Sequence, residues 1–298
     1  MTDASTPVPG SRALVLGGGG VAGIAWEVGV LTALQDAGVD LDAADLVVGT
    51  SAGSVVGAFV RNGAVQQAYD QQHTPAPTTY VEPPAIDTDA VQQRIGAALE
   101  GATGEQDARA RLGLAAQQVT DGQSDDERVA TFTETLPSTD WPAKPLAITA
   151  VDATDGTFRL LTAADGVPLP RAVAASCSVP FVWSPVGIEG RPYVDGGVRS
   201  GTNADAAAGH ERVLVIACGP EGPSPVGPWL DVAVESLRAG GSSVEVVVAD
   251  STAQEAFGTN SLSLATQAPS AEAGRAQGTA VAEQIAAFWA DDLVSVVA

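Results

Sequence analysis

The chain has 298 residues, a length that suits one large domain or two modest ones. With 45% hydrophobic and 17% charged residues it has enough apolar side chains for a sizeable core, which excludes disorder over most of its length. Its 36 acidic side chains outnumber the 14 basic ones, and the resulting net charge of −22 repels phosphates, which excludes a nucleic-acid-binding protein.

No targeting or membrane-spanning segment is expected in this sequence. Residues 1–10, MTDASTPVPG, are predicted to be a flexible tail, and they lack the basic and apolar regions of a signal peptide. No uninterrupted apolar run approaches the length of a membrane span. The two cysteines, Cys177 and Cys218, are too few for a disulfide framework. We therefore expect a soluble, cytoplasmic protein.

The N-terminal part alternates between strand and helix patterns. Short apolar runs predict strands at 12–17 and 44–49. Each is followed by apolar residues at helical spacing, which predicts helices at 23–38 and 52–63, with Gly38 and Asn62-Gly63 as stop signals. A βαβα start indicates a parallel sheet with helices on its faces, so the fold class is α/β.

The composition changes at 64–143, which is rich in Gln, Thr, Ala, Asp and Pro. We expect a helical insertion there, with helices near 88–100, 105–119 and 125–136, which either caps a site or forms a plain peripheral layer. Asp155-Gly156 predicts a hairpin within 144–162. Further strands are expected at 191–195, 212–218 and 243–249, and a last helix at 269–290.

A glycine-rich turn follows the first predicted strand. Gly18, Gly20 and Gly23 fit the G-x-G-x-x-G spacing of a dinucleotide-binding turn. The same backbone amides are equally suited to stabilising the oxyanion of an acyl-transfer reaction. The glycines alone leave both alternatives open.

A possible nucleophile follows the second predicted strand. Gly49-Thr50-Ser51-Ala52-Gly53 is a G-x-S-x-G motif between a strand and a helix, the context in which a serine is exposed on a strained turn. In a dinucleotide-binding unit this strand would instead end on an acidic residue that holds the ribose. No carboxylate occupies that place, so we interpret the glycine turn as an oxyanion hole that faces Ser51.

The base for such a serine is expected to be a carboxylate. His73 lies in a polar loop, and His210 precedes a strand and therefore lies at the opposite sheet edge. Asp195 follows a short strand and precedes two glycines, which makes it the remaining candidate. The order Ser51, Asp195, His210 also matches an α/β-hydrolase, but only one strand precedes this serine motif, which disfavours that fold.

Four blocks in this order resemble the patatin-like phospholipases, in particular the bacterial patatin-like serine acyl hydrolases. They are GGGVAG (18–23), GTSAG (49–53), ASCSVPFVWSP (175–185) and DGG (195–197). The resemblance implies a three-layer α/β/α fold with a mostly parallel central sheet. It also implies a single domain over 11–298, with 64–143 as the insertion or cap.

The resemblance further implies a role for individual residues. Ser51 is the expected nucleophile and Asp195 the expected base of a catalytic dyad. The expected oxyanion-hole amides are those of Gly18, Gly19 and Gly20, and the remaining motif glycines are Gly23, Gly49, Gly53, Gly196 and Gly197. Pro180 is expected to shape the loop beside the dyad. Ala22 departs from the family pattern, which usually has Arg or Lys there.

The expected function is therefore hydrolysis of lipid or other acyl esters, without a cofactor or a metal. The alternative is a catalytically silent relative that binds acyl chains or a partner protein. A nucleotide-binding module is a third, disfavoured interpretation. The acidic chain is expected to make at most weak contact with membranes, because acidic side chains oppose binding to anionic lipids.

Overall fold

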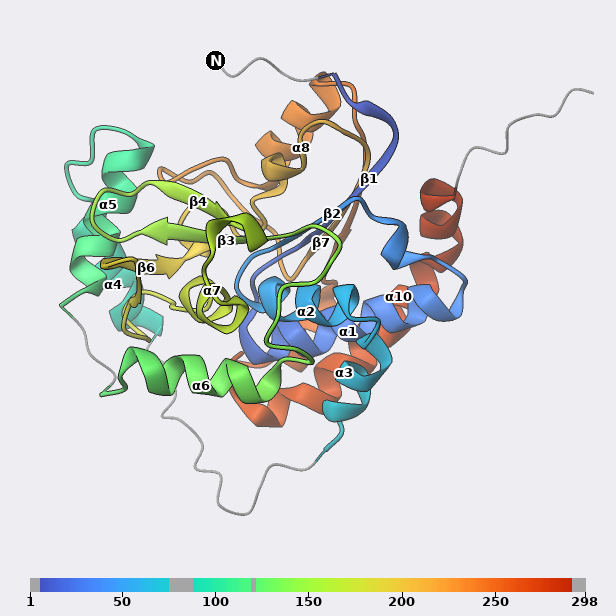
Figure 1. The fold of residues 1–298 in the computed structure, drawn as a ribbon, viewed down its shortest axis with the longest axis horizontal. Helices are drawn as coiled ribbons and strands as arrows, with labels where there is room; N and C mark the ends of the chain where they lie inside the picture. The colour runs from blue at the N-terminus through green and yellow to red at the C-terminus, as the bar shows by residue number, and fades with distance from the viewer. Residues whose placement is uncertain (1–5, 75–87, 119–121, 291–298) are drawn as a thin grey trace, which may run out of the picture.

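The computed structural model describes residues 6–74, 88–118 and 122–290. Its centre is an eight-stranded sheet, in which seven strands follow the order β5-β6-β3-β2-β1-β7-β8 and β4 also pairs with β3. Helices cover both faces of the sheet (Figure 1). This is the α/β fold with a mostly parallel central sheet that the sequence predicts.

Five strands are joined to one another by parallel pairing, and three more are added by antiparallel pairing. The parallel strands are β1 (Val8–Leu16), β2 (Leu46–Gly49), β3 (Leu146–Asp152), β7 (His210–Ala217) and β8 (Ser243–Val248). The strands added by antiparallel pairing are β4 (Phe158–Leu161) and β6 (Arg191–Asp195), which both pair with β3, and β5 (Val186–Ile188), which pairs with β6. The expected hairpin is β3–β4, which turns at Asp155-Gly156.

The alternating side chains of β1 show how the sheet separates two apolar layers. Leu14 and Leu16 join the core formed with one helical layer. Ala13 and Val15 join a second core on the other face. The first layer contains α1 (Gly20–Asp36), α2 (Ala52–Arg61), α3 (Val65–Gln71), α7 (Leu169–Ser176), α9 (Ser251–Phe257) and α10 (Gln267–Trp289). The second contains α8 (Leu230–Ala239).

The described parts of 64–143 contain helices close to the predicted positions, and these helices pack against different parts of the fold. Its helices after α3 are α4 (Thr88–Leu99), α5 (Glu105–Ala116) and α6 (Asp125–Thr135). Helix α3 packs on α1 and α2, and α6 packs on α7. Helices α4 and α5 join a small third core with β3 and β6. Most of the segment between α3 and α4 lies outside the described residues.

Several boundaries differ by a few residues from the prediction, and two of these differences lie in β1 and α1. Strand β1 begins at Val8, so residues 8–10 belong to the sheet and not to a tail. The reason is local pairing, because the Val8 amide donates to the Gly209 carbonyl at 2.9 Å and the Gly10 amide donates to the Glu211 carboxylate. Helix α1 begins three residues earlier than predicted, directly at the end of the glycine turn.

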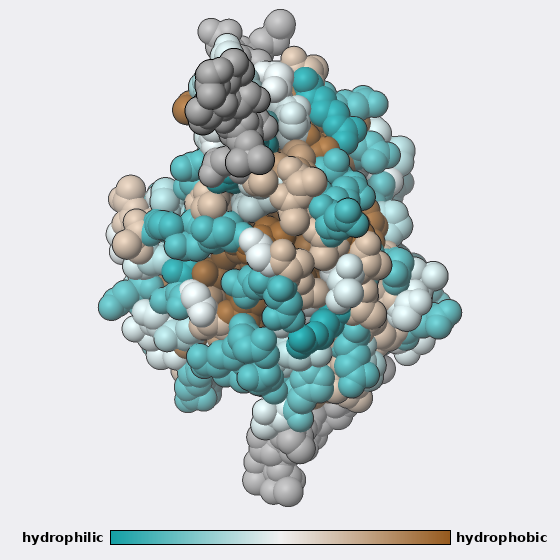
Figure 2. Space-filling view, turned by 90° about the vertical axis from the view of Figure 1, so that its right-hand side faces the viewer, coloured by the Kyte–Doolittle hydropathy of each residue, from teal (hydrophilic) through white to brown (hydrophobic). Residues whose placement is uncertain are grey.

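One face of the surface combines hydrophilic and apolar residues. On the side where α10 lies, hydrophilic residues surround a central hollow in which apolar residues are visible (Figure 2). Within the described ranges, no helix has the length and apolar character needed to cross a membrane.

Candidate active site

Strands β1 and β2 are neighbours, and they end side by side because Leu16 pairs with Gly49. The glycine turn after β1 and the serine turn after β2 therefore open at the same edge of the sheet, where ligands bind in such folds. Asp195 reaches this edge from β6. Asp195 pairs with Ala150 of β3, which lies two residues beyond the residue that pairs with Gly49. Ser51 also lies two residues beyond Gly49, so Asp195 and Ser51 reach the same level of the sheet.

Ser51 occupies a strained turn. Its φ of 51° and ψ of −116° lie in a region that non-glycine residues rarely adopt. The Ser51 amide donates to the Ser176 hydroxyl at 2.9 Å, which fixes the turn against α7. A strained turn between a strand and a helix is the context that the G-x-S-x-G motif predicts for this serine.

The two glycines of the serine motif are required by close packing. A Cβ on Gly53 would overlap the carbonyl group of Leu16, and a Cβ on Gly49 would lie 2.5 Å from the Gly53 oxygen. The Gly53 amide also donates to the Gly17 carbonyl at 2.8 Å, which ties the serine turn to the glycine turn. Both glycines therefore let the two turns approach each other.

The glycine turn offers fewer free amides than expected. The Gly18 amide donates to the Gly201 carbonyl at 2.8 Å, because the chain after Asp195 crosses beside this turn. In this structure the Gly18 amide is therefore already engaged in a hydrogen bond. The amides of Gly19 and Gly20 make no hydrogen bond within the described part of the chain; Gly19 is the N-cap of α1 and Gly20 is its first residue.

Asp195 is buried, with 4% of its surface exposed. Its Oδ1 accepts a hydrogen bond from the Gly197 amide at 2.7 Å, and its own amide donates to the Ser178 carbonyl at 3.0 Å. Its other oxygen, Oδ2, is buried and has no hydrogen-bond partner among the described residues. The carboxylate is thus held by one oxygen, while the second is left to accept a proton or a new hydrogen bond.

Burial raises the pKa of Asp195 to about 6. The Gly197 amide, the Ser51 hydroxyl and the charge of Arg128 act in the opposite direction, since each favours the ionised carboxylate. The Ser51 hydroxyl is thus close enough to influence the carboxyl, although the pair does not reach hydrogen-bond geometry. Such contacts commonly tighten only when substrate binds.

Asn203 is a site residue that the sequence analysis missed. It is fully buried and adopts a left-handed conformation, with φ of 51°, which Asn tolerates better than most residues. Its Nδ2 lies 3.1 Å from both the Thr50 hydroxyl and the Gly196 carbonyl. Asn203 therefore links the residue before Ser51 to the residue after Asp195. Its partners are brought together only by the fold.

Arg128 is a second residue that was missed. It comes from α6, and its guanidinium lies 4.1 Å from the ring centre of Trp183 and donates to the Cys177 carbonyl at 2.9 Å. It places a positive charge near the carboxylate, although the usual basic residue of the glycine turn is replaced by the fully buried Ala22. Burial raises the pKa of the Cys177 thiol to about 12, so this neighbour of Ser51 stays protonated.

Neither histidine lies near Ser51. His73 packs against the ring of Tyr69 at the end of α3, and its Nδ1 lies 3.1 Å from the Tyr69 carbonyl. His210 begins β7, at the end of the strand away from the glycine turn, and its Nδ1 lies 2.9 Å from the Ala207 carbonyl. The described residues also contain no group of three or more His, Cys, Asp or Glu side chains suited to a metal ion.

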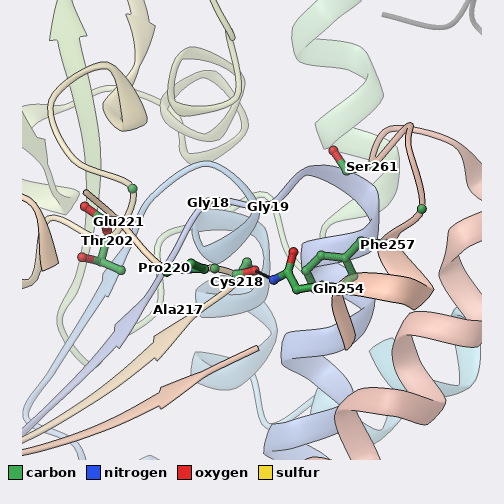
Figure 3. A pocket seen from close by; sticks show the side chains of 13 residues that line it. Gly18, Gly19, Thr202, Ala217, Cys218, Pro220, Glu221, Gln254, Phe257 and Ser261 are labelled. Atoms are coloured by element: carbon green, nitrogen blue, oxygen red, sulfur yellow. Dashed lines mark hydrogen bonds between the residues drawn. The ribbon is translucent and has the colours of Figure 1, made fainter. Parts of the chain in front are cut away.

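Three cavities adjoin the glycine turn. The largest, of about 560 Å³, is lined by Gly18–Gly20, Ser51 and Asp195 together with mainly apolar side chains. A smaller one of about 210 Å³ also contains Ser51. A third, of about 360 Å³, lies beside Gly18 and Gly19 at the end of β7 and contains neither Ser51 nor Asp195 (Figure 3). The Gln254 side chain closes part of it by donating to the Cys218 carbonyl at 2.7 Å.

Comparison with known proteins identifies the family. Residues 14–208 match the model of the patatin-like phospholipase family. No curated protein matches the chain. Among solved structures, the chain is similar to VipD from Legionella pneumophila, with 14% identity and a TM-score of 0.47 over 93% of this chain and 68% of that chain.

It is also similar to the type III effector protein ExoU, with 16% identity and a TM-score of 0.42 over 94% of this chain. This chain covers 54% of the ExoU chain, so it spans about half the length of that protein. The family match covers well over half of the 298 residues and contains all four motif blocks. The chain therefore belongs to the patatin-like phospholipase family.

Proposed function

We propose that this protein is a serine acyl hydrolase that cleaves acyl esters with a Ser51–Asp195 dyad. The observation that supports this most directly is that the strained Ser51, the buried Asp195 and the glycine turn line one cavity. The cavity is otherwise mainly apolar, which suits the hydrocarbon parts of a lipid or another apolar ester. Family membership supports the same class of reaction.

The first half of the reaction forms an acyl-enzyme. Asp195 takes the proton of the Ser51 hydroxyl while Oγ bonds to the ester carbonyl carbon, whose oxygen becomes an oxyanion. The free amides of Gly19 and Gly20 stabilise that charge, and in known enzymes one such donor contributes roughly 3–4 kcal/mol. The bond between carbon and the alcohol oxygen then breaks, and Asp195 returns the proton to the departing alkoxide.

The second half releases the acid. A water molecule gives its proton to Asp195 and bonds to the acyl carbon, and the bond to Ser51 breaks as Oγ recovers a proton from Asp195. An ordinary carboxylate with a pKa near 4 is a weak base for a hydroxyl. The raised pKa of Asp195 supports its role, because it makes the carboxylate more basic while leaving it mostly ionised at pH 7.

The test combines active-site labelling with ester hydrolysis. Wild-type protein should react with a fluorophosphonate probe at Ser51 and hydrolyse p-nitrophenyl butyrate. Ser51→Ala and Asp195→Asn should each lower kcat/KM by about a thousandfold or more, as expected for members of a catalytic unit. Ser236→Ala and Asp231→Asn on the exposed face of α8 serve as matched controls and should leave both signals unchanged.

Failure of the folded wild-type protein to react with the probe would contradict the hydrolase proposal and favour the silent, acyl-binding alternative. Normal hydrolysis by a folded Asp195→Asn variant would leave a serine hydrolase but remove the proposed base.

A further inference from the structure

Ser51 lies where two cavities meet. We call the cavity of about 560 Å³ the large cavity and that of about 210 Å³ the small cavity. Both are lined by Gly20, Ser51, Val179 and Leu262, so an ester bound at Ser51 can extend into each of them. Asp195 lines the large cavity and not the small one.

The elements that build the two cavities differ. The large cavity is completed by Val91, Ile95 and Leu99 of α4 and Leu112 of α5. The small cavity is completed on the other side by Ile24 of α1, by Thr131 and Phe132 of α6, and by Trp183. A substitution on α4 therefore changes one cavity, and a substitution on α6 changes the other.

The position of the base decides which part of an ester enters which cavity. Asp195 first receives the Ser51 proton and then gives it to the alkoxide that leaves. The alcohol oxygen must therefore be within reach of Asp195, on the side of the large cavity. The acyl chain is bonded to the same carbon and points away from the alcohol oxygen, towards the side where Asp195 is absent.

We propose that the small cavity binds the acyl chain and the large cavity binds the alcohol part of the substrate. This inference rests on the proposed hydrolase function. The small cavity has less than half the volume of the large one, so the preferred substrate carries a short acyl chain on a bulkier, apolar alcohol.

The walls of the small cavity suit a hydrocarbon chain. Ile24, Phe132 and Trp183 provide apolar surface. Its one charged group, Arg128, has its guanidinium stacked over Trp183 and directed to the Cys177 carbonyl. The Cys177 thiol is protonated, so it adds no negative charge beside the acyl chain.

The experiment narrows each cavity separately. Thr131→Trp narrows the small cavity, and Ile95→Trp narrows the large one; both positions lie on helices at the cavity walls. Thr133→Trp is a control on an exposed position of α6 outside both cavities.

Two series of substrates are compared. One substrate series varies the acyl group of p-nitrophenyl esters from acetyl through butyryl and octanoyl to palmitoyl. A second keeps the butyryl group and varies the alcohol from methyl to naphthyl.

Wild-type protein should prefer short acyl groups and the bulky alcohol. Thr131→Trp should lower kcat/KM for the octanoyl ester relative to the acetyl ester by about tenfold or more, which is the size of effect typical of hydrophobic pockets, and leave the alcohol preference unchanged. Ile95→Trp should change the alcohol preference and leave the acyl preference unchanged. Thr133→Trp should change neither.

The reverse pattern, in which Ile95→Trp alters acyl-chain preference and Thr131→Trp does not, would overturn the assignment while leaving the hydrolase function intact. A wild-type preference for palmitoyl over butyryl would also overturn it. Absence of all hydrolysis together with an unlabelled Ser51 would instead refute the proposed function itself. Circular dichroism of each variant separates these outcomes from loss of folding.

Discussion

At neutral pH the ionised carboxylate of Asp195 lowers the stability of the fold, because it is buried away from water. Burial raises its pKa from 3.8 to about 6, so the folded protein binds a proton at this group more tightly than the unfolded chain does. The protonated carboxyl group therefore adds to the free energy of unfolding. This contribution is fully present below about pH 4 and is lost as the pH rises through about 6. The proposed role of Asp195 as a base would be an example of function gained at the expense of stability.

Asp195→Asn should therefore be more stable than the wild-type protein at pH 8 and nearly equal to it at pH 4. The gain at pH 8 is at most on the order of 3 kcal/mol, because one pKa unit corresponds to about 1.4 kcal/mol. Urea unfolding of both proteins across this pH range measures the difference. A difference that is the same at both ends of the range would show that Asp195 is not the group responsible.

At the scale of elements, close packing of α1 against α10 holds the beginning of α1 beside the active site. A Cβ on Gly274 would overlap the Trp26 carbonyl, and a Cβ on Gly278 would lie 2.7 Å from the Val30 oxygen. Helix α10 lies outside residues 14–208, which match the family model. Its glycines nevertheless position helix α1, whose first residue, Gly20, has an amide without a hydrogen-bond partner among the described residues.

Gly274→Ala should lower the free energy of unfolding by roughly 1–3 kcal/mol, since overpacked side chains force helices apart. Gly96→Ala in α4 is the matched control, because a Cβ there meets no atom within 4 Å. That control should be neutral or stabilising by up to about 1 kcal/mol, as alanine favours helix more than glycine does. Denaturant unfolding of both variants checks the contrast, and equal effects would contradict the packing argument.

Local signals account for what the sequence predicted well at this scale. Apolar runs that end in glycine identified β1, β2 and the two turns between strand and helix, and the structure confirms that these strands are neighbours. The sequence did not predict the hydrogen bonds from Asn203 to Thr50 and Gly196, because they join segments that are distant along the chain. The bond from the Gly18 amide to Gly201 was missed for the same reason.

The three-residue strand β5 and the short helix α7 are too brief to give a periodic pattern. The glycines of α10 would have been counted against a helix by propensity alone, yet they are required by the neighbouring helix. The register between β6 and β3, which brings Asp195 level with Ser51, depends on tertiary pairing and not on local sequence.

At the scale of the whole molecule, the net charge of −22 opposes contact with an anionic lipid surface. Several basic side chains are already paired with aspartates, among them Lys144 with Asp42 at 2.6 Å and Arg275 with Asp36 at 2.8 Å. Each basic residue near an anionic membrane contributes about 1 kcal/mol of attraction, and the excess of acidic residues opposes it.

The protein should therefore hydrolyse esters in neutral vesicles faster than in anionic vesicles at low salt. Added salt should raise the rate on anionic vesicles, because it screens the repulsion between the acidic surface and the lipid. Phosphatidylcholine vesicles with and without phosphatidylglycerol, each carrying the same fluorogenic ester, provide the comparison. Faster hydrolysis in the anionic vesicles at low salt would show that a local basic surface dominates the net charge.

The most direct test of the dyad is the rate at which a fluorophosphonate labels Ser51 as a function of pH. In the wild-type protein the rate should rise as the pH passes through about 6, where Asp195 loses its proton, and then level off. In Asp195→Asn the rate should be slow and should lack this rise. Labelling of Asp195→Asn at the wild-type rate, with the same rise near pH 6, would contradict the assignment of Asp195 as the base.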